Sequence, residues 1–273
     1  MNKKTLLITG CSSGIGLDTA RALQSSYHII ATARKEEDIY KLQEEGFETY
    51  KLDVTLSSEI DSVLETVLTK HKTLYALFNN AGYGQPGAVE DISKAVLQEQ
   101  FETNFFGMWE LTTKAIKIFR KQGFGRIINH SSVLGLISLR FRGAYNASKY
   151  AIEGMNDTLR LELMGTDIYV ITLNTGPIES DFRKNATKKF FQNLSNYKES
   201  VFVQEYEKEL LEQKDPPNDP FTCKSDIVIA NVKDALEAKV PKPRYYNTKA
   251  TYLLGFLKRL LPTAWLDKLL QKI

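Results

Sequence analysis

The fold of this 273-residue chain is decided near its start, by the stretch Thr5-Leu6-Leu7-Ile8-Thr9-Gly10-Cys11-Ser12-Ser13-Gly14-Ile15-Gly16. The apolar run predicts a buried strand, and the residues after Gly14 predict a helix. Small residues between them let the backbone turn sharply and approach a pyrophosphate at the positive end of that helix. We therefore expect a nucleotide site at Gly10, Ser12, Ser13, Gly14, Ile15 and Gly16. The spacing is Gly-x-x-x-Gly-x-Gly, and a glycine-rich turn without a ligand is the alternative.

The end of the next predicted strand indicates which nucleotide binds. A carboxylate there would hold the ribose hydroxyls of NAD, whereas an arginine accommodates the extra phosphate of NADP. This strand ends in Arg34 and Lys35 with no acid, which favours NADP (NADPH) over NAD. Asp53 and Val54, after the third strand, are further candidates for cofactor contact. Asp53 could bond the adenine amino group or cap the helix that begins at Ser57, and both interpretations stay open.

Strand-like and helix-like segments alternate along the first two thirds of the chain, which is typical of a parallel sheet covered on both faces. Strands are predicted at Thr5–Thr9, His28–Thr32, Glu48–Leu52, Leu74–Asn79, Gly125–Ser131, Ile168–Asn174 and Arg244–Asn247. Helices are predicted at Ile15–Ser25, Glu36–Glu45, Ser57–His71, Ser93–Lys121 and Gly143–Gly165. We expect an α/β fold, a Rossmann-type doubly wound parallel sheet with helices on both faces, as a single domain over residues 1–273.

Composition excludes several other classes. The net charge of +3 gives no nucleic-acid signal, and no apolar run reaches the ~18 residues of a membrane span. Two cysteines cannot build a disulfide framework, so a cytoplasmic protein with reduced thiols is expected. The apolar stretch near the start is too short for a secretion signal. The three histidines, His28, His71 and His130, lie far apart in the sequence, and no metal site is expected.

A proton-transfer group is predicted in the second half of the chain. Tyr145 and Lys149 share one helix face because they lie four residues apart, and Ser132 precedes them at the end of a strand. Lowering a phenol pKa from ~10 to about 7 takes roughly 4 kcal/mol, which one cation ~4 Å away can supply at an effective dielectric of ~20. A surface tyrosine and lysine on an ordinary helix are the alternative.

Together with Thr9-Gly-x-x-x-Gly-x-Gly16, Asn79-Asn80-Ala81-Gly82, Asn104 and Gly176-Pro177-Ile178, these residues stand in the order found in the short-chain dehydrogenase/reductase family. The chain resembles that family closely over residues 3–180. It is most similar to bacterial NADP-dependent aldehyde reductases and to hydroxysteroid and retinol dehydrogenases.

The resemblance implies roles for individual residues. Tyr145 would exchange a proton with the substrate oxygen, Lys149 would lower its pKa and hold the nicotinamide ribose, and Ser132 would bond the oxyanion. Asn104 would anchor a water that relays protons to Lys149, unless it lies exposed on its helix. The remaining cofactor contacts would come from Asn80, Ala81, Gly82, Gly176, Ile178 and Ser180.

Two parts of the chain depart from the family pattern. Thr175 stands where a proline is frequent, and Ser180 where a threonine is usual. His130 is the second oddity, since an apolar residue is usual at that point of the strand. We interpret His130 as a hydrogen-bonded core histidine rather than a pocket residue.

Apolar and aromatic residues flank the predicted acid and base. Substrate contacts are expected from Val133, Leu139, Tyr145 and Phe182, with Tyr83, Leu134 and Phe141 as further pocket candidates. Residues 181–222 would form either a lid that adds Phe190, Phe191 and Tyr197 or a poorly ordered surface segment. Such a lining favours a small lipophilic aldehyde, ketone or alcohol.

The tail, residues 248–273, carries two predicted amphipathic helices divided near Pro262. From Lys239 onward there are eight Lys/Arg and one acid, Asp267. Peripheral contact with an anionic membrane and docking on the chain's own domain or a second subunit are both open, with docking favoured. The resemblance implies a homodimer paired through the long helices at 93–121 and 143–165.

We therefore predict an NADP-dependent oxidoreductase that moves hydride between nicotinamide and a lipophilic carbonyl compound or alcohol, with carbonyl reduction favoured. A non-catalytic NADP(H)-binding regulator and a membrane-surface interaction protein are the alternatives.

Overall fold

The computed structural model describes residues 3–208 and 221–273. Seven parallel strands form one sheet in the order β3-β2-β1-β4-β5-β6-β7. The strands are β1 Lys4–Ile8, β2 Tyr27–Ala33, β3 Glu48–Lys51, β4 Ala76–Asn79, β5 Phe124–Ser132, β6 Asp167–Thr175 and β7 Arg244–Tyr246. All seven predicted strands are confirmed within two residues at each end. The order reverses between β1 and β4, where open sheets of this kind bind ligands.

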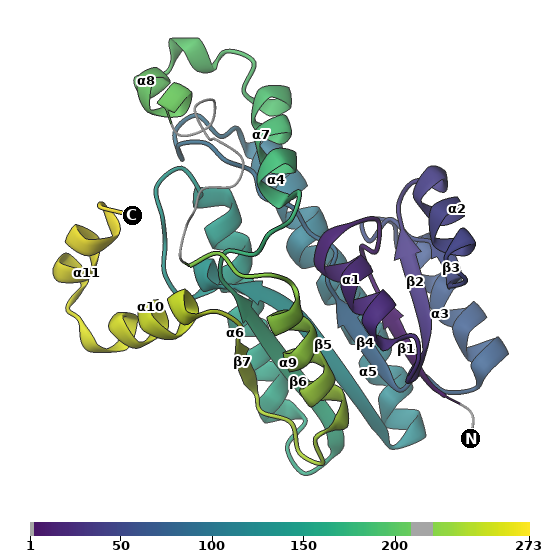
Figure 1. Ribbon diagram of the computed structural model, residues 1–273. Coiled ribbons are helices and arrows are strands. Elements are labelled where there is room, and N and C mark those ends of the chain that lie inside the picture. The colour runs from purple at the N-terminus through teal and green to yellow at the C-terminus, as the bar shows by residue number, and fades with distance from the viewer. Residues whose placement is uncertain (1–2, 209–220) are drawn as a thin grey trace.

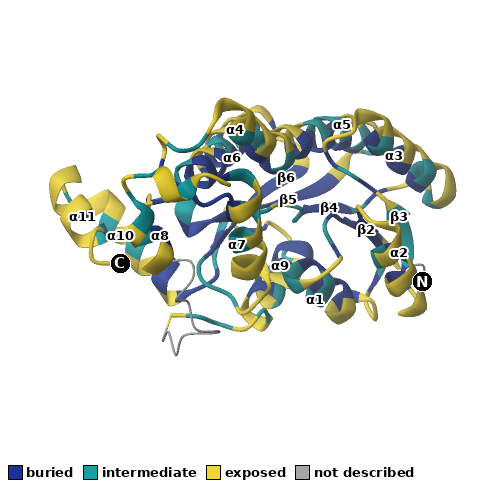
Figure 2. Ribbon diagram, turned by 90° about the horizontal axis from the view of Figure 1, so that it is seen from above, coloured by how far each residue is buried: buried dark blue, intermediate teal, exposed yellow. Residues whose placement is uncertain are grey.

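Helices cover both faces of the sheet (Figures 1 and 2). Helices α1 Gly14–Leu23, α2 Glu36–Glu44 and α9 Asp226–Glu237 pack on one face, and α3 Ser57–His71, α5 Gly107–Gln122 and α6 Gly143–Glu162 pack on the other. The strands are apolar on both sides as a result, so Leu6 of β1 faces one helix layer and Leu7 the other. The predicted α/β doubly wound sheet is confirmed.

Two helices differ from the prediction. The segment expected as one helix at 93–121 is divided into α4 Lys94–Phe101, a π-helical turn η1 at Glu102–Phe106, and α5. Wide turns of this type re-aim side chains and are frequent at functional sites. Helix α9 was not predicted, because the charged segment before it hides the start of its apolar pattern.

The segment expected to form a lid is partly helical. It contains α7 Phe182–Asn193, a single turn η3 at Tyr197–Glu199, and α8 Val203–Tyr206, while residues 209–220 lie outside the described residues. Its aromatic side chains form a small core of their own with Phe141, Phe190, Leu194 and Tyr206. Phe141 and Phe190, predicted as pocket and lid residues, are therefore buried in this cluster.

The tail forms α10 Lys249–Leu260 and α11 Thr263–Leu270, as predicted, and both extend beyond β7 at the edge of the molecule (Figure 1). Thr248 caps α10 by accepting a hydrogen bond from the Thr251 amide. Gly255 packs against Leu136 and Tyr246, whereas Phe256 and Trp265 are exposed. No helix among the described residues is long and apolar enough to cross a membrane.

Two of the histidines meet in the fold. His28 and His71 are far apart in the sequence, but their rings lie 4.5 Å apart, centroid to centroid, and both bond Glu48. The expectation of no metal site stays a prediction. The pairing of β2 with β3 and the return of α3 to the start of the sheet bring these residues together.

Candidate active site

The glycine loop after β1 packs tightly against the turn after β4. Gly10 has φ 70°, and a Cβ atom there would lie 2.8 Å from the Ala81 Cα atom. The Thr9 hydroxyl accepts hydrogen bonds from the amides of Asn80 and Ala81, both at 3.0 Å. The Asn80 side chain donates back to the carbonyls of Thr9 and Gly10. These contacts require the small residues that the sequence places in both segments.

The start of α1 is free to receive an anion. Ser13 precedes the helix but makes no side-chain cap, and the first turn holds no acidic residue. Ser12 and Ser13 are exposed, and Ile15 anchors the turn in the core. The first amides of α1 and the positive end of its dipole are thus available to bind a diphosphate. A dinucleotide site requires such free amides.

The segment after β6 faces this loop. A Cβ atom on Gly14 would lie 3.5 Å from the Ser180 Cβ atom, so the two predicted cofactor segments are adjacent. Gly176 leaves no room for a side chain, since its Cβ atom would lie 2.1 Å from the Thr248 hydroxyl. Ile178 pairs with Cys223 in an isolated bridge, which holds this part of the backbone in place.

Arg34 follows β2 directly and is exposed, and it forms no ion pair with any residue in the described part of the chain. Asp53 does not cap α3. Its Oδ1 atom instead accepts hydrogen bonds from the Thr55 amide and hydroxyl, which forms a local turn. Val54 is buried beside Gly107.

Tyr145 and Lys149 lie on one face of α6, as their spacing predicts. The Lys149 ammonium donates a 2.7 Å hydrogen bond to the His130 carbonyl and lies 5.5 Å from the centre of the Tyr145 ring. The Ser132 hydroxyl, at the end of β5, accepts from the Leu134 amide and donates to the Thr175 carbonyl. The structure thus gathers three of the four predicted catalytic residues, Ser132, Tyr145 and Lys149, at the carboxyl edge of the sheet.

The acidities of these groups differ from the prediction. Burial raises the pKa of Tyr145 to about 12, and a hydrogen bond with Ser132 opposes that rise. Burial lowers the pKa of Lys149 to about 8, against the attraction of Glu153. The ammonium was expected to bring the phenol pKa toward 7. In the chain alone the pKa of Tyr145 is raised instead, because burial removes the phenolate from water.

Asn104 lies in the π-helical turn and is fully buried, so the alternative of an exposed asparagine is wrong. Its side chain accepts from the Tyr83 amide at 3.0 Å and donates to the Tyr83 carbonyl and the Ser148 hydroxyl. Gly82 lies close to the Asn104 side chain, since a Cβ atom on Gly82 would lie 3.1 Å from Asn104 Oδ1. Asn104 therefore joins the turn after β4 to α6.

The two departures from the family pattern are bonded to each other. The His130 ring bonds the Thr175 hydroxyl at 2.8 Å through Nε2 and the Asn80 oxygen at 3.0 Å through Nδ1. Asn247 donates a further bond to the Thr175 hydroxyl. His130 is hydrogen-bonded, as predicted, but it is half-buried rather than part of the core. Its role as a link between three strand ends was missed, because the sequence shows two unusual residues but not that they meet.

The predicted substrate residues differ in burial, and Phe182 is the one that packs on the phenol among the contacts of the described residues. Phe182 packs edge-to-face on the Tyr145 ring at 5.6 Å, and Gly84 lies opposite both rings. Val133 is buried in the turn after β5, and Leu139 is half-buried. A partly exposed aromatic ring over a buried phenol makes the rim of this site apolar.

Comparison with known proteins agrees with this geometry. The family model described as short chain dehydrogenase matches residues 4–190. The chain is 37% identical to the uncharacterized oxidoreductase YbbO of Escherichia coli, over 98% of this chain and 94% of that protein. It is 28% identical to the NADPH-dependent 3-dehydrocapnine reductase of Ornithobacterium rhinotracheale, over 97% and 95%. A crystal structure of a short-chain dehydrogenase from Streptomyces avermitilis superposes with a TM-score of 0.77 at 26% identity, covering 100% of this chain and 95% of that one.

The glycine loop, the uncapped helix and the Ser132, Tyr145 and Lys149 cluster thus occur on the expected fold, in a chain that the family model covers over more than half its length. The protein belongs to the short-chain dehydrogenase/reductase family and is an oxidoreductase.

Proposed function

We propose that this protein is an NADP(H)-dependent oxidoreductase acting on a lipophilic aldehyde, ketone or alcohol, with carbonyl reduction favoured. The observation that carries this proposal is the convergence of Ser132, Tyr145 and Lys149 beside a glycine loop whose helix presents free amides. When bound there, the nicotinamide would supply or accept the hydride.

The acid-base roles follow from the buried position of Tyr145. Because burial raises its pKa to about 12, the phenol carries its proton at neutral pH, which is the form needed to protonate a carbonyl oxygen. The Ser132 hydroxyl would donate to the same oxygen as negative charge develops on it. Lys149, with a pKa lowered to about 8, would return the proton through its ammonium group.

Asn104 would act as a positioning residue. Its side-chain oxygen and nitrogen are occupied by Tyr83 and Ser148, so a water relay to Lys149 would have to use its backbone carbonyl in the π-helical turn. The side-chain bonds would hold that carbonyl in place.

The preference for NADP rests on Arg34. An exposed guanidinium without an ion-pair partner among the described residues suits the extra phosphate on the adenosine ribose. Asp53 and Val54 would border the adenine. The relative from Ornithobacterium rhinotracheale is an NADPH-dependent reductase, which supports this preference.

The substrate class follows from the apolar rim. Phe182, Val133 and Leu139 offer little hydrogen bonding to a sugar or hydroxy acid, which favours a lipophilic substrate. The described part of the expected lid, residues 181–208, is proposed to cover the substrate within a single domain.

Two surfaces support proposals about partners. Phe106 and Trp109 are 48% and 47% exposed beside the helices that would pair in a homodimer. On the tail, Trp265 is 66% exposed, and Lys258 and Arg259 lie in the last turn of α10, which suits contact with an anionic membrane surface.

A screen of NADPH oxidation over medium- and long-chain aldehydes, steroids and retinoids tests the activity. Tyr145→Phe should lower turnover by about 10²–10⁴ while NADPH still binds, because only the proton donor is lost. Tyr150→Phe is the matched control, since this exposed phenol on the same helix bonds the Leu136 carbonyl. Unchanged turnover in Tyr145→Phe would refute the catalytic assignment.

A second experiment tests cofactor preference. Arg34→Gln should raise the KM for NADPH roughly 10- to 100-fold, through loss of a charged hydrogen bond, and leave that for NADH nearly unchanged. Lys41→Gln, an exposed lysine on α2, serves as the control. Equal losses with both cofactors would contradict the role of Arg34.

A further inference from the structure

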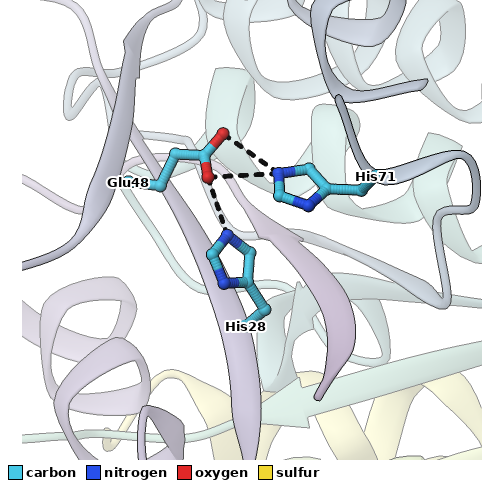
Figure 3. A group of neighbouring side chains, drawn as sticks. All are labelled: His28, Glu48 and His71. Carbon is cyan, nitrogen blue, oxygen red and sulfur yellow. Dashed lines mark hydrogen bonds and ion pairs between the residues drawn. The ribbon is translucent and has the colours of Figure 1, made fainter. Parts of the chain in front are cut away.

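A second group of chemically distinctive side chains lies at the amino edge of the sheet, opposite the candidate active site. His28 is near the start of β2, Glu48 begins β3, and His71 ends α3. Figure 3 shows the two imidazole rings directed at one carboxylate. His28 Nε2 lies 2.7 Å from Glu48 Oε2, and His71 Nε2 lies 3.1 Å from both oxygens.

The fold holds these three residues on regular elements rather than loops. His28 and Ile30 lie two residues apart on β2, so their side chains point to the same face of the sheet. The Ile30 side chain is buried there against α3 and α5. Ile30 is also the register partner of Glu48, which sets the carboxylate beside the histidine. Helix α3 ends at His71 because Lys72 takes a left-handed conformation with φ 65°. Ligands placed on rigid elements keep their geometry without an ion.

Neighbouring side chains fix the orientation of the Glu48 carboxylate. The Tyr50 hydroxyl donates to Oε1 at 2.6 Å and orients the group, so Oε2 faces the first histidine. A partner of this kind behind a ligand is common in metal sites.

We propose that His28, Glu48 and His71 bind one divalent cation of the zinc class, with water in the fourth position. The potential ligand atoms all lie within 4.8 Å of one another. Tetrahedral zinc with bonds of about 2.0–2.1 Å needs ligand atoms about 3.4 Å apart, so small side-chain rotations open the group around an ion. Two imidazoles and one carboxylate select Zn²⁺, Co²⁺ or Ni²⁺ over Mg²⁺ and Ca²⁺.

A lysine competes with the cation. The Lys70 ammonium lies 3.1 Å from Glu48 Oε2, on a side chain that is 57% exposed. The end of the Lys70 side chain is free to move into water. An entering ion therefore displaces the ammonium group and costs only its surface ion pair with Glu48. His28 and His71 also border a cavity of about 1030 Å³, which gives a hydrated ion access to the group. Lys3, Lys4 and Lys72 line this cavity, and their positive charges repel the ion. Removing Lys70 should therefore tighten metal binding.

The proposed ion would act on stability rather than on the reaction. It would join the start of β2, the start of β3 and the end of α3, and it would bind the folded chain in preference to the unfolded one. This inference is independent of the proposed function, since the active site lies at the carboxyl edge of the sheet.

Thermal unfolding of the full chain with Zn²⁺, and with Mg²⁺ as the comparison ion, tests the proposal. Zinc at about 100 times its Kd should raise Tm by roughly 5 °C, and Mg²⁺ should leave it unchanged. His28→Asn and His71→Asn should each abolish the rise. Glu44→Gln, which removes an exposed carboxylate from nearby α2, should retain it. Lys70→Gln should lower the Kd for zinc several-fold.

A cobalt spectrum identifies the ligands. The Co²⁺ complex should show the visible bands of a tetrahedral nitrogen and oxygen site without a thiolate charge-transfer band, which excludes Cys11 and Cys223. Zinc stabilisation that survives His28→Asn, a thiolate band, or no zinc-dependent shift in Tm would each overturn the proposal.

Discussion

His130 makes the stability of this protein depend on pH in a direction that the structure specifies. Burial, and then the nearby Lys149 charge, lower the pKa of His130 from 6.5 to about 3. Between those values the unfolded chain binds a proton that the folded chain rejects. The stabilisation is complete above pH 6.5 and is lost progressively as the pH falls toward 3.

The magnitude follows from that difference. Each unit of pKa difference corresponds to about 1.36 kcal/mol, so lowering the pH from 7 to 5 should cost about 2 kcal/mol through this residue alone. His130→Gln keeps a hydrogen-bonding side chain toward Asn80 or Thr175 but cannot take up the proton. The variant should be less stable at pH 7 and should lose about 2 kcal/mol less than the wild type on acidification.

Urea unfolding of both proteins at pH 7 and pH 5 measures how much unfolding free energy each one loses on acidification. The carboxylates that titrate in this range are the same in both proteins, so their contribution cancels when the two losses are subtracted. Equal losses in the two proteins would show that the folded chain protonates His130 readily, and the link between the strand ends would then not exclude the charge.

Three other perturbations have defined outcomes. Gly10→Ala should lose about 1–2 kcal/mol of stability at its φ of 70° and most cofactor affinity, since the added methyl meets the Ala81 backbone; urea unfolding and NADPH fluorescence titration measure both. Asn104→Ala removes three buried hydrogen bonds and should cost about 3 kcal/mol in urea unfolding; a loss below 1 kcal/mol would contradict its bridging role. Arg244→Met leaves the buried Glu153 carboxylate without its ion-pair partner and should cost about 3–5 kcal/mol, which Arg244→Met with Glu153→Met should largely recover in the same assay.

Sequence periodicity was sufficient to predict the sheet. Apolar runs such as the one at Leu6 are buried on both faces only in a parallel sheet between helix layers, so the fold class followed from local composition. The break of the helix at Glu102–Phe106 was not predicted, because no proline lies there and the one adjacent glycine, Gly107, is tolerated inside a helix. Its cause is tertiary, since Asn104 is turned inward to bond Tyr83 and Ser148.

The candidate site was predictable where its chemistry lies within one segment. The spacing of Tyr145 and Lys149 on one helix and the small residues after β1 carry their geometry in the sequence. The pKa of Tyr145 did not follow from its spacing to Lys149. Burial raises this pKa, and the degree of burial cannot be read from the spacing. Likewise, nothing in the sequence shows that His130 and Thr175 are bonded.

The sequence by itself determined the order of strands and helices and the identity of the residues at the carboxyl edge of the sheet, since both depend on patterns between near neighbours in the chain. Only the tertiary structure decided which distant residues meet and how far each is removed from water. It brought His28, Glu48 and His71 together from three elements and buried Tyr145. The physical reason is that desolvation and contact depend on all the atoms around a group, most of which belong to segments remote in the chain.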